Sequence, residues 1–554
     1  MPMPAMLSVS EARVSGARSG PVAGSHLVRR FGLPVTLVAL VAVLLAACGS
    51  SGSSSTSSTF PTSHTLQLSF LQDPGQPPDP DVYYAGEGLL LTRNLYEGLV
   101  KYQAGTASRV IQPSLATSWT SSNGGATYTF QLRQGVTFHD GTPFNSASVA
   151  PSFARRTAVN GGPAYMVAGV SSVQTPSPYT VVINLSAPNT AFLDYLASSY
   201  GPVMESPTAL AANAGSDNDQ TYLQTHDVGT GPYTLTQAKV GVSYQLQAYP
   251  GYWGKKPYYT TVNIPVIDNL STQEIQFNSG QLAGILHDLT TPAVAQYRTD
   301  ANSSFYSLPV IEEEGVYLNE HIGFLQSQAN RQAMLQAINA KSIVAGVFPG
   351  RATVATQATP SGLLPAGFGT QNISYDPAAL TAIIKKLPAD QKSITVGYDS
   401  GAPDDQLVAE QIAAQVQALG LTPKVVGYQT SAIYGWVGSG SAAASQGPSI
   451  LVYYVWPDAY NAYTWNHITY DSTGGLQYLT CSVPGIDATD TQAVTTGSNA
   501  DYNTAVQSAV KEGCWFNLAN RNDAMVFHTW MKGVNQAHVV AMPWALLLNQ
   551  LYPG

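Results

Sequence analysis

Residues 393–428 read SITVGYDSGAPDDQLVAEQIAAQVQALGLTPKVVGY, and this stretch decides the fold class. The run at 393–399 has the composition of a strand, and residues 406–420 have the apolar spacing of a helix that ends at Gly420. A second strand is predicted at 421–428. Because a strand–helix–strand crossover joins parallel strands, the sequence predicts an α/β protein.

Further elements are predicted on both sides of this unit. C-terminal to it, residues 431–447 lack periodicity and are predicted to be a loop. Towards the N-terminus, strands are predicted at 65–70, 127–133, 179–186 and 315–319, and the alternation at 233–249 predicts a hairpin. Helices are predicted at 89–100, 191–198, 330–348 and 375–387, and the stretch 271–285 has helical apolar spacing that Gly280 closes.

Length and composition limit the functional classes. A chain of 554 residues exceeds what one hydrophobic core usually serves, which predicts two or three lobes. Only 10% of the residues are charged, and the formal net charge is −9. No basic stripe is present that could neutralise phosphates, so a nucleic-acid partner is excluded.

The N-terminus resembles a lipoprotein signal peptide. Arg29 and Arg30 precede an apolar run, FGLPVTLVALVAVLLAA, which ends at Cys48. The resemblance implies cleavage after residue 47, lipidation of Cys48 and a flexible Ser/Thr-rich tether over 48–64. A permanent membrane span is the alternative, but the run is short for a bilayer and no basic flank follows it.

Cysteine usage agrees with export. Cys48 is assigned to the lipid, which leaves Cys481 and Cys514 as an even pair in an oxidising compartment. A disulfide is therefore predicted between them, with two free buried thiols as the alternative. A zinc site is disfavoured because no histidines cluster near these cysteines.

Several segments, in order along the chain, resemble the large binding proteins of the peptide/nickel class of ABC importers, solute-binding family 5. They include NLYEGLVKY (94–102), GATYTFQLRQGVTFHDGTPFNSASV (125–149), GTGPYTL (229–235), YPGYWGKKP (249–257) and VAEQIAAQVQALGL (408–421). The resemblance implies a periplasmic-binding-protein type II-like fold with three lobes and a hinge between lobes I and III. It also implies a receptor outside the cytoplasm that captures a small solute, with a peptide favoured, and delivers it to membrane permease subunits as a monomer.

The implied lobes divide the mature chain unevenly. Lobe I takes residues 65–110, 225–307 and 531–554, lobe II is inserted at 111–224, and lobe III covers 308–530. Gly229 and Gly231 permit a sharp backbone turn where lobe II returns to lobe I, so they are predicted to act as a hinge, with a plain loop as the alternative.

The segment LVYYVWPDAYNAYTW (451–465) is the predicted ligand site, because its aromatic residues surround one carboxylate, Asp458. A carboxylate is the expected partner of a ligand ammonium group in a partly dry cleft, and a strand-end aspartate that caps a local turn is the alternative for Asp458. Trp456 and Tyr454 are predicted to wall a side-chain pocket, with core packing as the alternative. By resemblance, Glu97, Gly98, Leu99 and Asn319 are expected to line the opposite side, where an extended ligand can bond to backbone.

Two other functions are alternatives to that of a transport receptor. A secreted hydrolase is disfavoured because the chain has no G-x-S-x-G, S-x-x-K, H-E-x-x-H or C-x-x-C motif. We therefore predict no catalytic residue, cofactor or metal. A sensor or surface-interaction protein of the same fold stays open, and so does an oligosaccharide as the ligand, since aromatic walls suit sugars and peptides alike.

Overall fold

The computed structural model describes residues 63–437 and 440–554. The predicted signal peptide, the lipidation site Cys48 and most of the predicted tether lie outside the described residues. Within the described ranges, no helix combines the length and the apolar character that crossing a bilayer requires.

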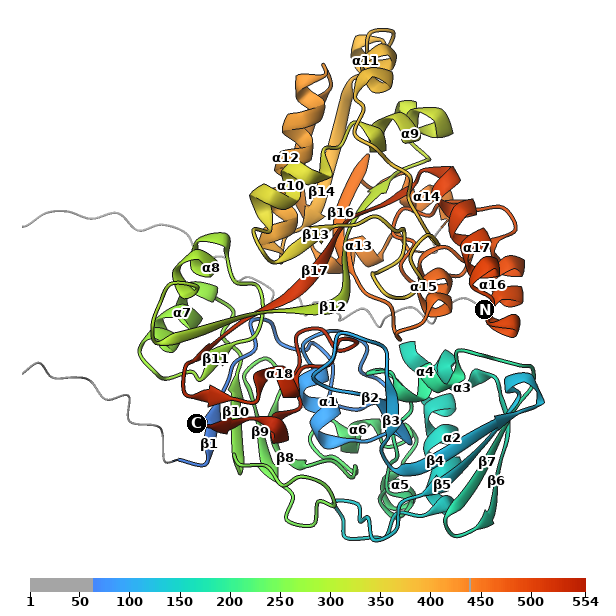
Figure 1. Ribbon diagram of the computed structural model, residues 1–554, viewed down its shortest axis with the longest axis vertical. Helices are drawn as coiled ribbons and strands as arrows, with labels where there is room; N and C mark the ends of the chain where they lie inside the picture. The colour runs from blue at the N-terminus through green and yellow to red at the C-terminus, as the bar shows by residue number, and fades with distance from the viewer. Residues whose placement is uncertain (1–62, 438–439) are drawn as a thin grey trace, which may run out of the picture. The chain divides into compact units, whose positions relative to one another are not determined.

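The first sheet joins segments that are far apart in the sequence (Figure 1). Strand β1 (Thr65–Gln67) runs parallel to β10 (Thr261–Pro265), which pairs with β9 (Ser243–Ala248) and, through it, with β8 (Tyr233–Lys239). The hairpin predicted at 233–249 is confirmed. Alternate residues of its strands are buried, because one face of the sheet packs on the core.

The second sheet is antiparallel and has the order β4 (Ala116–Ser122), β5 (Thr127–Leu132), β7 (Thr180–Leu185) and β6 (Val170–Ser177). Tyr128, Phe130 and Leu132 of β5 are buried, as the alternating sequence requires. The predicted strands at 127–133 and 179–186 are confirmed as neighbours. All four strands fall within the stretch assigned to lobe II, although the lobe boundaries themselves stay predictions.

The third sheet has the order β11 (Gly284–Ile285), β17 (Trp515–His528), β12 (Ser303–Leu318), β16 (Ile450–Val455), β14 (Ser393–Asp399) and β15 (Thr422–Tyr428), and β13 (Ala352–Val354) pairs with β17. Strands β15, β14 and β16 are parallel. Helix α12 (Pro403–Ala418) connects β14 to β15, so the predicted crossover is confirmed.

The strand predicted at 315–319 is only the last part of β12, which spans sixteen residues and pairs along most of its length with β17. The prediction was too short because Pro309 and the acidic run Glu312–Glu314 interrupt the apolar alternation. The structure buries these three glutamates to 2% exposure or less. Arg521 on the paired strand forms ion pairs with Glu312 and Glu314, which offsets part of their desolvation.

Two helix predictions and one loop prediction differ from the structure. The helix predicted at 89–100 ends at Leu95, because Gly98 lies close to the carbonyls of Leu196 and Pro202 and the chain continues into β2 (Val100–Tyr102). The helix predicted at 330–348 is divided where Asn339 caps a second helix with its side chain. The predicted loop at 431–447 contains two short helices. Local hydrogen bonds are enough to form a single helical turn, and so short a helix shows no apolar periodicity in the sequence.

The remaining helices and strands complete the described chain. The helices are α1 (Leu89–Leu95), α2 (Val149–Val159), α3 (Tyr165–Ala168), α4 (Phe192–Ala197), α5 (Pro207–Asn213), α6 (Gln220–Leu223), α7 (Leu270–Asn278), α8 (Thr291–Tyr297), α9 (Gln328–Gln336), α10 (Ala340–Val347), α11 (Ala378–Ile384), α13 (Thr430–Tyr434), α14 (Gly440–Ala444), α15 (Ala462–Thr469), α16 (Ile486–Thr496), α17 (Asn499–Glu512) and α18 (Val534–Ala537). The short strands are β3 (Ile111–Pro113), which pairs with β2, and β18 (Met531–Lys532), which pairs with β19 (Tyr552–Pro553).

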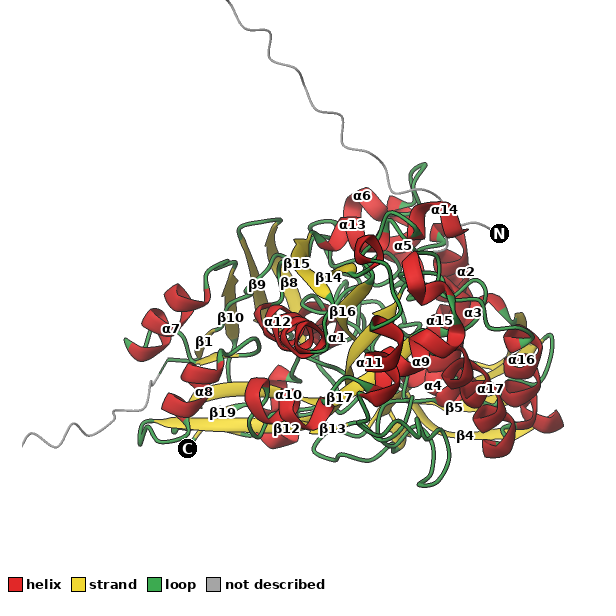
Figure 2. Ribbon diagram, turned by 90° about the horizontal axis from the view of Figure 1, so that it is seen from above, coloured by secondary structure: helices red, strands yellow, loops and turns green. Residues whose placement is uncertain are grey.

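The third sheet is covered on both faces, and β16 shows how. Ile450 and Val452 belong to the apolar cluster that contains residues of α12, whereas Leu451 and Tyr453 belong to the cluster that contains residues of α15, α16 and α17. Figure 2 shows α16 and α17 side by side, and α17 contacts β17 of this sheet. A strand buried on both faces is uniformly apolar, which explains the continuous run ILVYYV.

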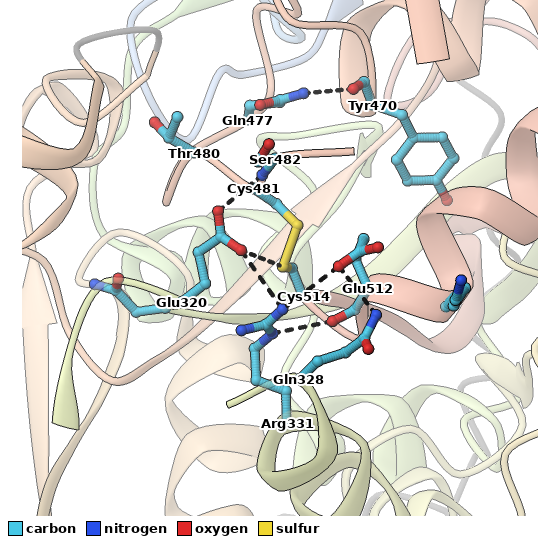
Figure 3. The surroundings of a disulfide bond; sticks show 12 residues. Glu320, Gln328, Arg331, Tyr470, Gln477, Thr480, Cys481, Ser482, Glu512 and Cys514 are labelled. Atoms are coloured by element: carbon cyan, nitrogen blue, oxygen red, sulfur yellow. Dashed lines mark hydrogen bonds and ion pairs between the residues drawn. A yellow bond between two sulfur atoms is a disulfide. The ribbon is translucent and has the colours of Figure 1, made fainter. Parts of the chain in front are cut away.

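The predicted disulfide between Cys481 and Cys514 is present in the structure (Figure 3). It ties the loop before α16 to the residue that precedes β17. Arg331 lies beside it and donates to the carbonyl oxygen of Glu512 at 3.0 Å, with the Glu320 carboxylate 3.5 Å away. The bridge therefore joins a region that ion pairs also hold together.

Candidate functional site

Asp458 lies just after the end of β16, in the turn that leads to α15. The hydroxyls of Tyr84 and Tyr165 both donate to its Oδ2 atom, at 2.5 and 2.7 Å. Ser198 donates to the backbone carbonyl oxygen of Asp458. Three segments that are 260 or more residues away in the sequence thus hold this carboxylate in place.

The other carboxylate oxygen of Asp458, Oδ1, is the feature of this arrangement that matters for binding. Among the residues that the structure describes, none donates a hydrogen bond to Oδ1 or forms an ion pair with it. Burial raises the pKa of the Asp458 carboxyl, although the two tyrosine hydroxyls and His467 oppose the shift. A carboxylate that is fixed through one oxygen, and has no cationic partner at the other, is suited to accept a hydrogen bond from a cation.

Tyr454, Trp456 and Trp544 form an aromatic wall near this carboxylate. The rings of Tyr454 and Trp456 are stacked with centroids 6.0 Å apart, and Trp544 lies 5.2 Å from Trp456 at a steep angle. The indole N–H of Trp456 donates to the Tyr200 hydroxyl at 3.1 Å, and Tyr200 packs against Tyr84. The wall and Asp458 are therefore linked by a chain of aromatic contacts.

Trp544 is held in an unusual conformation. Its φ of 63° lies in the left-handed region, which a bulky residue rarely adopts. Its backbone N–H donates to the buried Asp523 carboxylate, and the His287 ring stacks on the indole at 5.0 Å. A strained backbone of this kind persists only where several contacts hold the residue in place, and the Asp523 hydrogen bond and the His287 ring do so for Trp544.

Charged groups lie behind the aromatic wall. The Arg521 guanidinium is 5.2 Å from the centroid of the Tyr454 ring, and it pairs with Glu312 at 2.9 Å and with Glu314 at 3.2 Å. Burial raises the pKa of Glu312 to about 8 and that of Glu314 to about 7, although Arg521 opposes both shifts. Burial opposes protonation of His287, but the carboxylates of Asp288 and Glu87 raise its pKa to about 9.

The sequence matches a known family over most of its length. The profile described as "Bacterial extracellular solute-binding proteins, family 5 Middle" matches residues 110–477. The chain belongs to solute-binding family 5. This solute-binding protein is 24% identical, over 389 residues, to the probable D,D-dipeptide-binding periplasmic protein of Escherichia coli (strain K12), covering 69% of this chain and 75% of that one.

Solved structures agree on the fold. This solute-binding protein resembles the Helicobacter pylori periplasmic binding protein in complex with peptide STSA with a TM-score of 0.74 and 20% identity, over 88% of this chain and 98% of that one. It resembles the Brucella suis NikA structure with Fe(III)-EDTA with a TM-score of 0.75 and 22% identity, over 88% of this chain and 100% of that one. The predicted type of fold is confirmed. Membership of the family makes the protein a solute receptor rather than an enzyme.

The solute-binding protein does not bring all predicted ligand residues together. The Glu97 carboxylate accepts hydrogen bonds from Thr230, Tyr252 and Trp253, at 2.8 to 3.1 Å. Leu99 is fully buried, and Gly98 lies against the carbonyl oxygen of Leu196. These residues line the interior of the region around α1, so any contact with a ligand stays a prediction.

Asn319 also lies away from Asp458. Its amide donates to the carbonyl oxygens of Ala444 and Pro448, and its backbone N–H donates to Ser449. Ser449 precedes β16, whereas Asp458 follows it, so the two predicted residues lie beyond opposite ends of one strand. The six residues of β16 separate these ends by roughly 20 Å.

Gly229 and Gly231 pack against the end of α1. A Cβ atom added to Gly229 would lie 2.1 Å from the Leu95 carbonyl oxygen, and one added to Gly231 would lie 2.5 Å from that of Asn94. Both positions therefore need glycine for close backbone approach. A hinge role for them stays a prediction.

Four aromatic residues of this site were missed by sequence reasoning: Tyr84, Tyr165, Tyr200 and Trp544. Each is isolated in the sequence from the aromatic segment 451–465, and Tyr165, Tyr200 and Trp544 have no local pattern that marks them. A usable signal was the pair of tyrosines at 83–84, which follows a Pro/Asp-rich turn and so could not be ordinary helix core.

Proposed function

We propose that this protein is a lipid-anchored receptor outside the cytoplasm that binds a peptide through its free α-amino group and delivers it to an ABC importer. The observation that carries the proposal is the Asp458 carboxylate, which two tyrosines hold through Oδ2 while Oδ1 has no partner among the described residues. Family membership and the peptide-binding relatives support the ligand class.

The electrostatics of Asp458 favour a cationic ligand group. Burial disfavours the charged form of this carboxyl, as the raised pKa indicates. An ammonium group at Oδ1 would stabilise the charged form through a charge-assisted hydrogen bond, which is about twice as strong as a neutral one. The faces of Tyr454 and Trp456 would then contact the first side chain of the peptide.

The proposed binding mechanism is closure around the solute. Tyr84 and Asp458 are 374 residues apart in the sequence, and their hydrogen bond joins the first part of the chain to the turn that follows β16 of the third sheet. A solute that contacts both sides only in the closed form shifts the population towards closure, because it has a higher affinity for that form. The permease would recognise the closed receptor, which acts as a monomer anchored through Cys48.

The test is calorimetric titration of the purified protein with a dipeptide and with its N-acetylated form, after native mass spectrometry has identified the class of retained ligand. Asp458→Asn is expected to weaken binding of the free-amine peptide by about tenfold or more, because it removes a charge-assisted bond. The acetylated peptide is expected to bind weakly to both proteins.

Asp73→Asn is the matched control, since Asp73 also accepts a tyrosine hydroxyl, from Tyr244 at 2.9 Å, but lies in another region. Its peptide affinity should equal that of the wild type. An unchanged affinity in Asp458→Asn would remove this residue from the site. A retained oligosaccharide, for which stacked aromatic rings are also suited, would overturn the peptide assignment.

A further inference from the structure

A cavity of about 70 Å³ is lined by residues that neighbour one of the segments that support Asp458. Ala197 and Ser199 line it, whereas Ser198 between them donates to the Asp458 carbonyl oxygen. By the same measure one water molecule needs about 10–15 Å³, so the cavity has room for several waters or for a small polyatomic ion.

Two cationic side chains line this cavity without an acidic partner. Arg93 comes from α1 and Lys101 from β2. Across residues 63–437 and 440–554, neither side chain forms a hydrogen bond or an ion pair; Lys101 only approaches the Trp253 ring, at 6.0 Å. Burial lowers the pKa of Arg93 to about 10 and also lowers that of Lys101, although Glu97 opposes both shifts.

The acidic side chain that lines the cavity, Glu97, already accepts hydrogen bonds from other side chains. Glu97 accepts from Thr230, Tyr252 and Trp253, so its oxygens are satisfied by neutral donors. Ser114 also lines the cavity, is 1% exposed, and its hydroxyl has no hydrogen-bond partner within the described part of the chain. The cavity therefore offers two cationic side chains and an unpaired hydroxyl against one carboxylate that is already engaged, which is an arrangement that suits an anion.

We propose that this cavity is a binding site for a small oxyanion, either a carboxylate or inorganic phosphate, held by Arg93, Lys101 and Ser114. The anion would supply the acceptors that these donors lack and the negative charge that offsets two partly desolvated cations. This site is separate from the proposed solute site: among the described residues, no hydrogen bond, ion pair or ring contact joins its three ligating side chains to Asp458 or to the aromatic wall.

The test is calorimetric titration of the purified protein with inorganic phosphate and, separately, with acetate, in a low-chloride buffer of constant ionic strength. We expect saturable binding of at least one of them, with a dissociation constant of about 1 mM or lower. Arg93→Met and Lys101→Met are each expected to weaken that binding by about tenfold or more. Both variants remove a partly buried cation that has no ion-pair partner among residues of the described ranges, so folding should be preserved.

Lys255→Met is the matched control, because Lys255 lies near the cavity, is exposed, and bonds to Gln550 without lining the cavity. Its anion affinity should equal that of the wild type. Binding of phosphate alone or of acetate alone supports the site and identifies the oxyanion. Absence of saturable binding to the folded wild type, or equal affinity in the wild type and Arg93→Met, would overturn the proposal.

Discussion

At the scale of single residues, Asp490 links pH to stability. It is fully buried in α16, and its Oδ1 atom accepts from Asn466 at 2.8 Å. Burial and the neighbouring Asp471 carboxyl raise its pKa far above the ordinary aspartate value. In the unfolded chain the group ionises near pH 4, so the folded state binds the extra proton and loses stability as pH rises from about 4 towards the folded pKa.

Asp490→Asn should therefore stabilise the protein at pH 8 and have little effect at pH 4. Asparagine cannot ionise, and its amide group can donate to Asp471 as the protonated acid does. We expect a gain of about 1 kcal/mol or more in the free energy of unfolding at pH 8, measured by urea denaturation at both pH values. An equal gain at the two pH values would show that ionisation is not the cause.

Gly229 is a second position where one residue decides stability. Gly229→Ala places a methyl group against the Leu95 carbonyl oxygen and is expected to cost about 1–3 kcal/mol in the free energy of unfolding. Gly346→Ala is the control, since its Cβ meets nothing within 4 Å and the position is helical. The control should be as stable as the wild type or more stable. A Gly229→Ala protein with wild-type stability would contradict the packing seen here.

At the scale of elements, the disulfide makes a contribution to stability that can be measured directly. It closes a loop over a sequence separation of 33 residues, which includes α16 and α17. The Cys481→Ser/Cys514→Ser double variant is expected to lose about 3–4 kcal/mol in the free energy of unfolding by the chain-entropy argument. Differential scanning calorimetry of the two proteins measures the difference. Two reactive thiols at these positions in the native protein would contradict the bridge.

At the scale of the whole molecule, the proposed closure has two measurable consequences. A peptide that binds only the folded protein should stabilise it by about 2.7 kcal/mol when its concentration is a hundred times its dissociation constant. The radius of gyration from small-angle X-ray scattering should fall on saturation, because the solute favours the closed form. Superimposable scattering curves with and without a saturating peptide would count against closure, even if the peptide binds.

Local periodicity explains which elements could be predicted. Strong apolar patterns mark β14, α12 and β15. The spacing of apolar residues in each follows from the geometry of one strand or one helix, so neighbouring residues are enough to show it. β12 was only partly predicted, because the acidic run at 312–314 is compatible with a strand only when Arg521 lies beside it. That partner is about 200 residues away, so no local window contains it.

The sequence by itself determined the α/β class, the family, the paired cysteines and the aromatic segment around Asp458. Only the tertiary structure decided which side chains meet. It placed Tyr84 and Tyr165 on Asp458, Glu97 in the lining of a cavity that Asp458 does not line, and Asn319 beyond the far end of β16. The physical reason is that periodicity records which face of an element is buried, whereas contacts between distant elements depend on how those faces pack together.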